Sequence, residues 1–179
     1  ICKDDVLGFV DSCSINQVNY RLSVLSEESP YARCFAIFIR NLLGDTSLKK
    51  DSNFLINAIV KSVKQFHSFQ DLEGKPFRQL LCFSLSAISI LDTKCVTLLD
   101  SYVSEQLSFY DQNSLKRLGC LDGIAGSGNQ AMFYAIFLIH SSEYMGINTS
   151  LRIKSWIELH IKSINSYGFW GDFHNLTHL

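Results

Sequence analysis

The sequence predicts an all-α protein built from helical hairpins arranged in two layers. Three apolar segments recur along the chain; they begin at Phe35, Phe83 and Tyr134, which are 48 and 51 positions apart. An interval of about 50 residues is the size of one helical hairpin. Each apolar segment is followed by apolar residues at the i, i+3, i+4, i+7 spacing of an amphipathic helix. No stretch alternates with the period of two that marks a half-buried strand.

The first hairpin is expected near residues 30–66. Ser29-Pro30 places a capping hydroxyl before a proline at the first helical position, where the missing amide hydrogen is not needed. The apolar run Cys34 to Ile39 forms the first helix of this hairpin, and Asp51 stands where its amphipathic partner begins. The stripe of that partner consists of Ile56, Ile59, Val60 and Val63.

The second and third hairpins are expected near residues 76–110 and 129–166. Lys75-Pro76 marks the start of the second apolar helix, and Thr93 and Thr149 stand where the two amphipathic helices begin. Their stripes are Val96, Leu99, Val103, Leu107 and Tyr110 in the second hairpin, and Ile153, Trp156, Ile157, His160, Ile161 and Ile164 in the third.

The run CFAIFI at residues 34–39 is apolar on all sides of a helix, which predicts a helix with neighbours on every side. Its amphipathic partner needs only one buried face. Hairpins that pair an apolar helix with an amphipathic one form an inner layer of apolar helices and an outer layer of amphipathic helices. Such hairpins stack either around a closed ring or as an open solenoid.

Composition excludes several classes of function. The chain has 179 residues, with 16 basic and 17 acidic side chains and a formal net charge of -1, so nothing predicts nucleic acid as a partner. The apolar runs are shorter than the roughly 18 residues of a membrane-spanning helix, and the N-terminus lacks a signal-peptide pattern. We predict one cytoplasmic domain, residues 1–179, that does not enter a membrane.

The six cysteines contain no C-x-x-C pair, which excludes a zinc framework. Cys34 and Cys82 lie inside apolar runs, where a thiol behaves as a small hydrophobic group. We therefore predict reduced cysteines and no disulfide framework, as in a cytosolic protein.

The hairpin pattern resembles the α/α-toroid proteins, which include the six-hairpin glycosidases, heparinase-like polysaccharide lyases and terpene cyclases. GSGNQAMFYAIFLI opens an inner helix and SINSYGFWG closes an outer one, and the resemblance covers residues 29–171 at the level of architecture. The terpene cyclases have a Q-x-x-x-G-x-W signature, of which Gly168-Phe169-Trp170 supplies only the last three positions because Ile164 replaces the glutamine. The acidic D-x-D-D motif is also absent from the sequence, so the cyclases are the poorer match. The resemblance therefore implies a glycoside hydrolase or a polysaccharide lyase.

Three hairpins account for half of a six-hairpin ring. An open half-ring leaves an apolar edge large enough to require a partner. We therefore expect that edge to pair with further residues of the same chain, of which this sequence would be a fragment, or with a second copy.

The first candidate site is the loop Leu121 to Asn129, which contains three glycines and precedes the third apolar helix. Free amides at a helix N-terminus favour an anionic or polyhydroxyl ligand. The loop lacks the lysine of a phosphate-binding loop and the preceding strand of a dinucleotide site, so we predict no cofactor. Gly126, Ser127 and Asn129 are predicted to bind substrate, and the toroid resemblance implies an acid/base or sugar-binding role for Asp122. The alternative is a plain connector in which Asp122 and Asn129 form turns and caps.

The second candidate site lies in the segment GFWGDFHNLTH near the end of the sequence. The indole of Trp170 can stack on a sugar ring, although packing beneath a loop is an alternative role. Asp172 and His174 are suited to moving protons near neutral pH. His174 and His178 are four positions apart but no third ligand is evident, so we predict no metal.

Two hypotheses about function remain. In the first, the protein is a carbohydrate-active enzyme that acts on an oligosaccharide or another small polar ligand in a central cavity, with Asp122, Asp172 and His174 as catalytic residues. In the second, it is a non-catalytic helical-repeat scaffold that binds a protein or peptide.

Overall fold

The computed structural model describes residues 2–68, 75–117 and 127–148, together with residues 154, 155, 158 and 162. This part of the chain is mostly helical and contains no β-strand, so the all-α prediction is confirmed for it. Contacts between Cα atoms divide the chain into two units, Ile1–Leu99 and Asp100–Leu179. The toroid, the solenoid, the single domain and its hairpin boundaries stay predictions.

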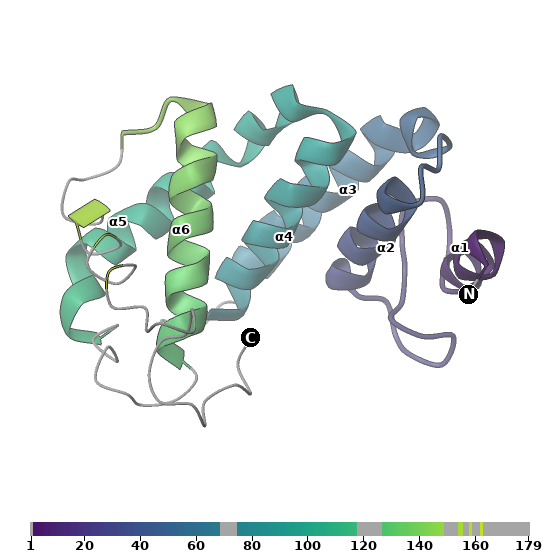
Figure 1. Ribbon diagram of the computed structural model, residues 1–179, viewed down its shortest axis with the longest axis horizontal. Helices are drawn as coiled ribbons and strands as arrows, with labels where there is room; N and C mark the ends of the chain where they lie inside the picture. The colour runs from purple at the N-terminus through teal and green to yellow at the C-terminus, as the bar shows by residue number, and fades with distance from the viewer. Residues whose placement is uncertain are drawn as a thin grey trace. The chain divides into compact units, whose positions relative to one another are not determined.

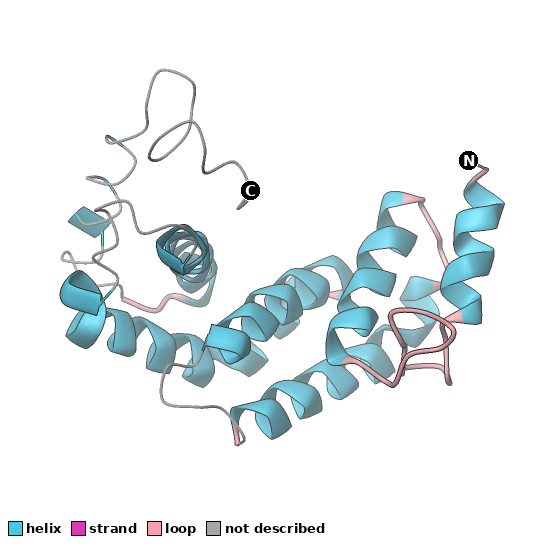
Figure 2. Ribbon diagram, turned by 90° about the horizontal axis from the view of Figure 1, so that it is seen from below, coloured by secondary structure: helices cyan, strands magenta, loops and turns pink. Residues whose placement is uncertain are grey.

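The first unit is a cluster of helices in which α4 packs against both α2 and α3 (Figure 1). Helix α1 packs against α2, and the short 3₁₀-helix η1 follows α4 and packs against it. Figure 2 shows the same helices from below, with the long α1–α2 loop beside them. The bounds of these elements are Lys3–Ser12 for α1, Pro30–Leu42 for α2, Leu48–His67 for α3, Lys75–Leu91 for α4 and Thr93–Leu99 for η1.

The second unit contains α5, Asp100–Arg117, and α6, Ser127–Met145, which pack against each other. In α6, Leu138 is fully buried and Ile136 is half-buried. Helix α6 begins at Ser127, so the third apolar helix is confirmed, but Ser127, Gly128 and Asn129 belong to this helix and not to the predicted loop.

The predicted helix starts are largely confirmed. Helix α2 begins at Pro30 and α4 begins at Lys75, next to the second proline. Ser29 has the extended backbone of an N-cap, but its side chain makes no capping bond. The backbone amide of Ser29 donates to the carbonyl of Tyr20 at 2.9 Å. Helix α3 begins at Leu48, so Asp51 lies in its first turn rather than at its cap.

The stripe predicted for α3 is confirmed at Ile56, Ile59 and Val63, which are buried, whereas Val60 is only half-buried. Lys61 and Lys64 are exposed, as expected for the other face. The next amphipathic segment was predicted as one helix from Thr93. It is instead divided into the 3₁₀-helix η1 and α5, and the boundary between the two units falls between them. Its stripe is nevertheless buried at Val96, Leu99, Val103 and Leu107.

For the third hairpin, residues 154, 155, 158 and 162 are helical and exposed, which fits the polar face of the predicted helix. Thr149 and the predicted stripe from Ile153 to Ile164 lie outside the described residues.

The expectation that the CFAIFI helix has neighbours on every side is wrong for α2. Cys34, Ala36 and Ile37 are buried, but Phe35 is 38% exposed and Ile39 is only half-buried. Helices α3 and α4 pack against α2, whereas α1 covers the remaining side only in part. The same expectation holds better for α4, in which Phe77, Leu80, Leu81, Leu85, Ala87 and Ile88 are all buried.

An aromatic cluster joins α2 to α4. The ring of Phe83 on α4 lies 5.4 Å from that of Phe35, 6.1 Å from that of Tyr31 and 6.3 Å from that of Phe38, measured between ring centroids. The Tyr31 and Phe38 pairs are edge-to-face, an arrangement that aromatic rings favour beyond the burial of their area. The partly exposed Phe35 is therefore held in place from the α4 side.

Arg33 of α2 fixes the α1–α2 loop, residues 13–29, against the helices. The side chain is 3% exposed, and its guanidinium donates to the carbonyl of Val18, the side-chain oxygen of Asn19 at 2.6 Å and the hydroxyl of Ser62 at 2.8 Å. It also donates to the carbonyl of Ala58 at 3.1 Å. Glu28 lies 3.6 Å away as a partly exposed counter-ion. Burial lowers the pKa of Arg33 from its ordinary value, so these bonds are needed to keep the charge inside the protein.

The cysteines of the described residues are all free thiols, at positions 2, 13, 34, 82 and 95, as predicted; Cys120 lies outside those residues. Burial raises the pKa of the Cys34 thiol from 9.0 to about 11, and burial also raises the pKa of Cys82. Both thiols are therefore neutral hydrophobic groups in the core.

We expect Arg33→Met to lower the free energy of unfolding by about 3 to 5 kcal/mol, since it leaves the part-buried carbonyls and the Asn19 side-chain oxygen without their donor. Urea denaturation followed by circular dichroism measures the change. Lys61→Met on the exposed face of α3 is the control and should shift the value by no more than about 0.5 kcal/mol. A loss below about 1 kcal/mol in Arg33→Met would show that the loop does not depend on this side chain.

The raised pKa of Cys34 predicts a loss of stability in alkali. The folded state favours the neutral thiol, so the contribution is complete below pH 9.0 and is lost as the pH rises towards about 11. A shift of this size corresponds to on the order of 2 to 3 kcal/mol. The measurement is the free energy of unfolding between pH 8 and pH 11 in the wild type and in Cys34→Ala, which should show the smaller decline. Cys2→Ala, at an exposed thiol, should retain the full decline, and equal declines in all three proteins would contradict the assignment.

Candidate functional site

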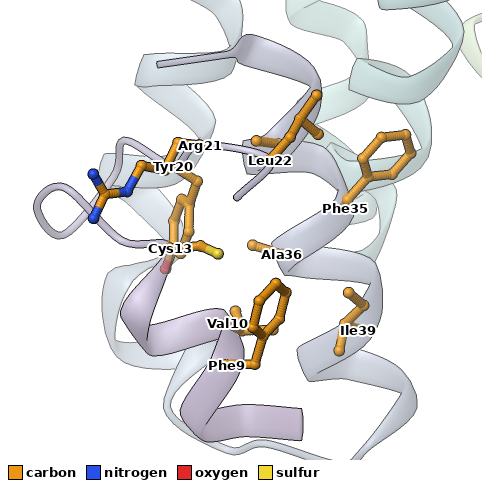
Figure 3. Close-up of a pocket in the computed structure, with 10 residues that line it drawn as sticks. Phe9, Val10, Cys13, Tyr20, Arg21, Leu22, Phe35, Ala36 and Ile39 are labelled. Carbon is orange, nitrogen blue, oxygen red and sulfur yellow. The ribbon is translucent and has the colours of Figure 1, made fainter. Parts of the chain in front are cut away.

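The incompletely covered side of α2 borders an apolar groove between α1, α2 and the α1–α2 loop (Figure 3). The α1–α2 groove has a volume of about 230 Å³. It is open at the surface, because Phe9 is 54% exposed and Leu22 is 56% exposed. Its lining consists of Phe9, Val10, Cys13, Tyr20, Arg21, Leu22, Ala32, Phe35, Ala36 and Ile39.

The spacing of small and large residues on α2 produces this groove. Ala32 and Ala36 are four positions apart and occupy one face of the helix, where their short side chains leave room. Phe35 and Ile39 are also four positions apart and form the neighbouring ridge. The close-up shows Ala36 at the centre with Phe35 and Ile39 on one side and Tyr20 and Cys13 on the other (Figure 3).

The α1–α2 loop forms the remaining wall and is held by its own turns as well as by Arg33. The side-chain oxygen of Asn16 accepts from the amides of Val18 at 3.0 Å and Asn19 at 2.9 Å, which closes an Asx turn. Isolated bridges pair Ser14 with Tyr20 and Arg21 with Glu28. Hydrogen bonds therefore hold the loop in a defined conformation, although it contains no strand.

The groove is almost entirely apolar. Arg21 contributes to its lining, but the guanidinium points away from the cavity and donates to the Ser12 carbonyl at 3.3 Å (Figure 3). No carboxylate and no imidazole belongs to the described lining. The titratable groups other than Arg21 that line it are the Cys13 thiol and the Tyr20 phenol.

A second, polar cavity of about 190 Å³ shares Tyr20 with the α1–α2 groove. We call it the Tyr20 cavity, since this side chain borders both spaces. The other residues that line it are Ser14, Gln17, Arg40, Ser47, Leu48, Asp51 and Leu55.

Arg40 is the cation of this second cavity and connects three segments of the first unit. Its guanidinium pairs with Asp45 at 2.5 Å and with Asp11 at the end of α1. Burial lowers the pKa of Arg40, but the hydrogen bonds to Asp45 and Asp11 raise it by more, so the pKa lies above its ordinary value. The pKa of Asp45 is lowered, first by the hydrogen bond from the Ser47 amide at 2.9 Å and also by Arg40.

Most residues that the sequence predicts for a site lie outside the described part of the chain. These are Asp122, Gly126, Trp170, Asp172 and His174. Ser127 and Asn129 fall in the first turn of α6, but their side chains are not among those described. The catalytic and substrate-binding roles of all seven residues therefore stay predictions.

Sequence reasoning missed both cavities in the first unit. A usable signal was present, because Ala32 and Ala36 repeat at helical spacing beside Phe35 and Ile39. In addition, the loop between two helices carries the apolar residues Leu22, Val24 and Leu25. Two alanines four positions apart, next to two bulky residues at the same spacing, indicate a furrow on the surface of the helix. The number of apolar residues in the segment, taken alone, indicates only that the segment is buried.

No protein-family model matches the chain, and neither a curated protein nor a solved structure shows significant similarity to it. Within the described residues, no group of three or more histidine, cysteine, aspartate or glutamate side chains is placed to hold a metal ion. None of the helices described is both long enough and apolar enough to span a bilayer.

Proposed function

We propose that the protein is a non-catalytic helical scaffold and that its first unit binds an apolar segment of a partner protein or peptide in the α1–α2 groove. The observation that carries the proposal is an open apolar groove whose wall residues Phe9, Leu22 and Phe35 are exposed to solvent. Clustered exposed apolar side chains around a concave surface mark interaction sites in soluble proteins.

The apolar surface extends beyond the groove onto the α1–α2 loop. Val24 is 44% exposed and Leu25 is 95% exposed, next to Leu22 in the sequence. Ser23 and Ser26 bond to each other across this turn, with the Ser23 amide donating to the Ser26 hydroxyl at 2.9 Å. The turn therefore presents its apolar residues from a fixed backbone, which limits the entropy lost on binding.

An amphipathic helix is the partner that best fits these features. Two helices, α1 and α2, form the walls, and an apolar furrow between helices accepts residues at i, i+4 and i+7 of a third. Asp5 precedes Phe9 by one turn on the same face of α1 and is exposed, so this end of the groove favours a basic residue on the partner.

We expect a fluorescein-labelled model peptide with leucines at i, i+4 and i+7 and a flanking lysine to bind the full chain, as measured by fluorescence anisotropy. Phe9→Ala and Phe35→Ala should each weaken binding by roughly tenfold, because buried aromatic anchors carry most of the energy of such interfaces. Phe54→Ala is the matched control, since Phe54 is 62% exposed on α3 and does not line the groove. Equal binding of a scrambled peptide, or an equal loss in Phe54→Ala, would show nonspecific adhesion and refute the proposal.

The carbohydrate-active function is the competing prediction, and it rests on the glycine-rich loop and the GFWGDFH segment. If it is correct, oligosaccharides will bind in calorimetric titrations, with Trp170→Ala abolishing the stacking contribution of about 1 kcal/mol or more. Asp122→Asn should remove turnover while leaving binding in place. Absence of oligosaccharide binding by the wild-type chain would leave the scaffold function alone.

A further inference from the structure

The α1–α2 groove is lined by aromatic rings from three different segments. Phe9 comes from α1, Tyr20 from the α1–α2 loop and Phe35 from α2. Phe9 and Phe35 are exposed, whereas Tyr20 is buried. An aromatic side chain that enters the groove therefore meets both exposed and buried rings, and contacts between rings are favourable beyond the burial of their area.

Small side chains leave room between these rings. Ala32, Ala36 and Cys13 line the groove and are each no more than 5% exposed. Cys13 is a free thiol, and Figure 3 shows its sulfur and the Phe9 ring pointing towards Ala36. Sulfur is polarizable and makes favourable contacts at the edge of an aromatic ring. An entering ring thus gains a contact that an aliphatic side chain does not make.

The volume of the groove fits one six-membered ring. The groove measures about 230 Å³, and an engineered apolar cavity of about 150 Å³ binds benzene. A leucine side chain is smaller than a benzyl group and leaves part of the space empty, where the lining loses van der Waals contacts. Because the lining is almost entirely apolar, phenylalanine fits better than tyrosine or tryptophan, whose polar atoms need a hydrogen-bond partner when buried.

Phe35 also joins the groove to the aromatic cluster between α2 and α4. Its ring centroid lies 5.4 Å from that of Phe83 and 6.3 Å from that of Phe38. These contacts restrict the Phe35 side chain before a partner arrives, so less conformational entropy is lost when the partner docks against it.

We propose that the partner helix anchors one phenylalanine side chain in the α1–α2 groove, between the rings of Phe9, Tyr20 and Phe35. The inference rests on the proposed peptide-binding function and names the side chain that the groove selects. Asp5 is exposed one turn before Phe9 and favours a lysine on the partner near this anchor.

The test compares three fluorescein-labelled model peptides with the full chain by fluorescence anisotropy. The peptides differ only at the central apolar position, which holds leucine, phenylalanine or cyclohexylalanine; the last keeps a six-membered ring but is not aromatic. The phenylalanine peptide is expected to bind roughly five- to tenfold more tightly than either of the others. Equal or tighter binding of the leucine or cyclohexylalanine peptide would overturn the anchor and leave the peptide-binding function in place. Failure of all three peptides to bind would refute that function, and the anchor with it.

Variants of the groove locate the preference. Phe9→Leu and Phe35→Leu keep apolar walls but each remove one ring, so each should reduce the preference for phenylalanine over cyclohexylalanine to about twofold or less. Ala36→Leu occupies the groove with its own side chain and should weaken binding of the phenylalanine peptide at least about tenfold.

Phe54→Leu is the matched control, because it removes an exposed ring of α3 that does not line the groove, and it should retain the full preference. An unchanged preference in both Phe9→Leu and Phe35→Leu would overturn the proposed ring contacts. Circular dichroism of each variant confirms that the helices are intact before affinities are compared.

Discussion

The buried guanidinium of Arg33 is the interaction on which the first unit depends. It bonds to residues 14 and 15 positions before it and 25 and 29 positions after it, so a single side chain joins the α1–α2 loop, α2 and α3. Removing a positive charge from water is costly, and Glu28 offsets it only in part because it is itself half exposed. The bonds to carbonyl and hydroxyl groups therefore supply most of the compensation, and they exist only when the loop is in this position.

Both cavities follow from that anchored loop. The Asn19 and Val18 contacts to Arg33 bring the following residue, Tyr20, against the helices, where it lines both the α1–α2 groove and the Tyr20 cavity. Tyrosine suits this position because it has an apolar ring and a polar tip. Serine at this position would remove the ring from the lining of both cavities.

The helices could be predicted from the sequence because their signals are local. The prolines at 30 and 76 mark helix starts within one residue, and the i, i+3, i+4, i+7 stripe of α3 matches its buried face. The division of the segment after Thr93 into η1 and α5 was missed, since the apolar spacing continues across the change from 3₁₀ to α geometry. The role of Arg33 was also missed, because its partners are mostly backbone carbonyls and a hydroxyl, which any residue pattern can supply.

The run CFAIFI shows why an apolar segment alone does not determine burial. Cys34 and Ile37 are in the core, yet Phe35 is exposed beside the buried Ala36, within the same turn of α2. A helix in a small unit has more apolar surface than its neighbours can cover when one neighbour, α1, has only 10 residues. The uncovered part lies at Phe35 and Ile39, beside the buried Ala32 and Ala36 that line the α1–α2 groove. Leucines at the two alanine positions would fill the groove with their own side chains. The partial exposure of Phe35 and Ile39 beside these alanines is the feature on which the proposed peptide-binding role of the α1–α2 groove rests.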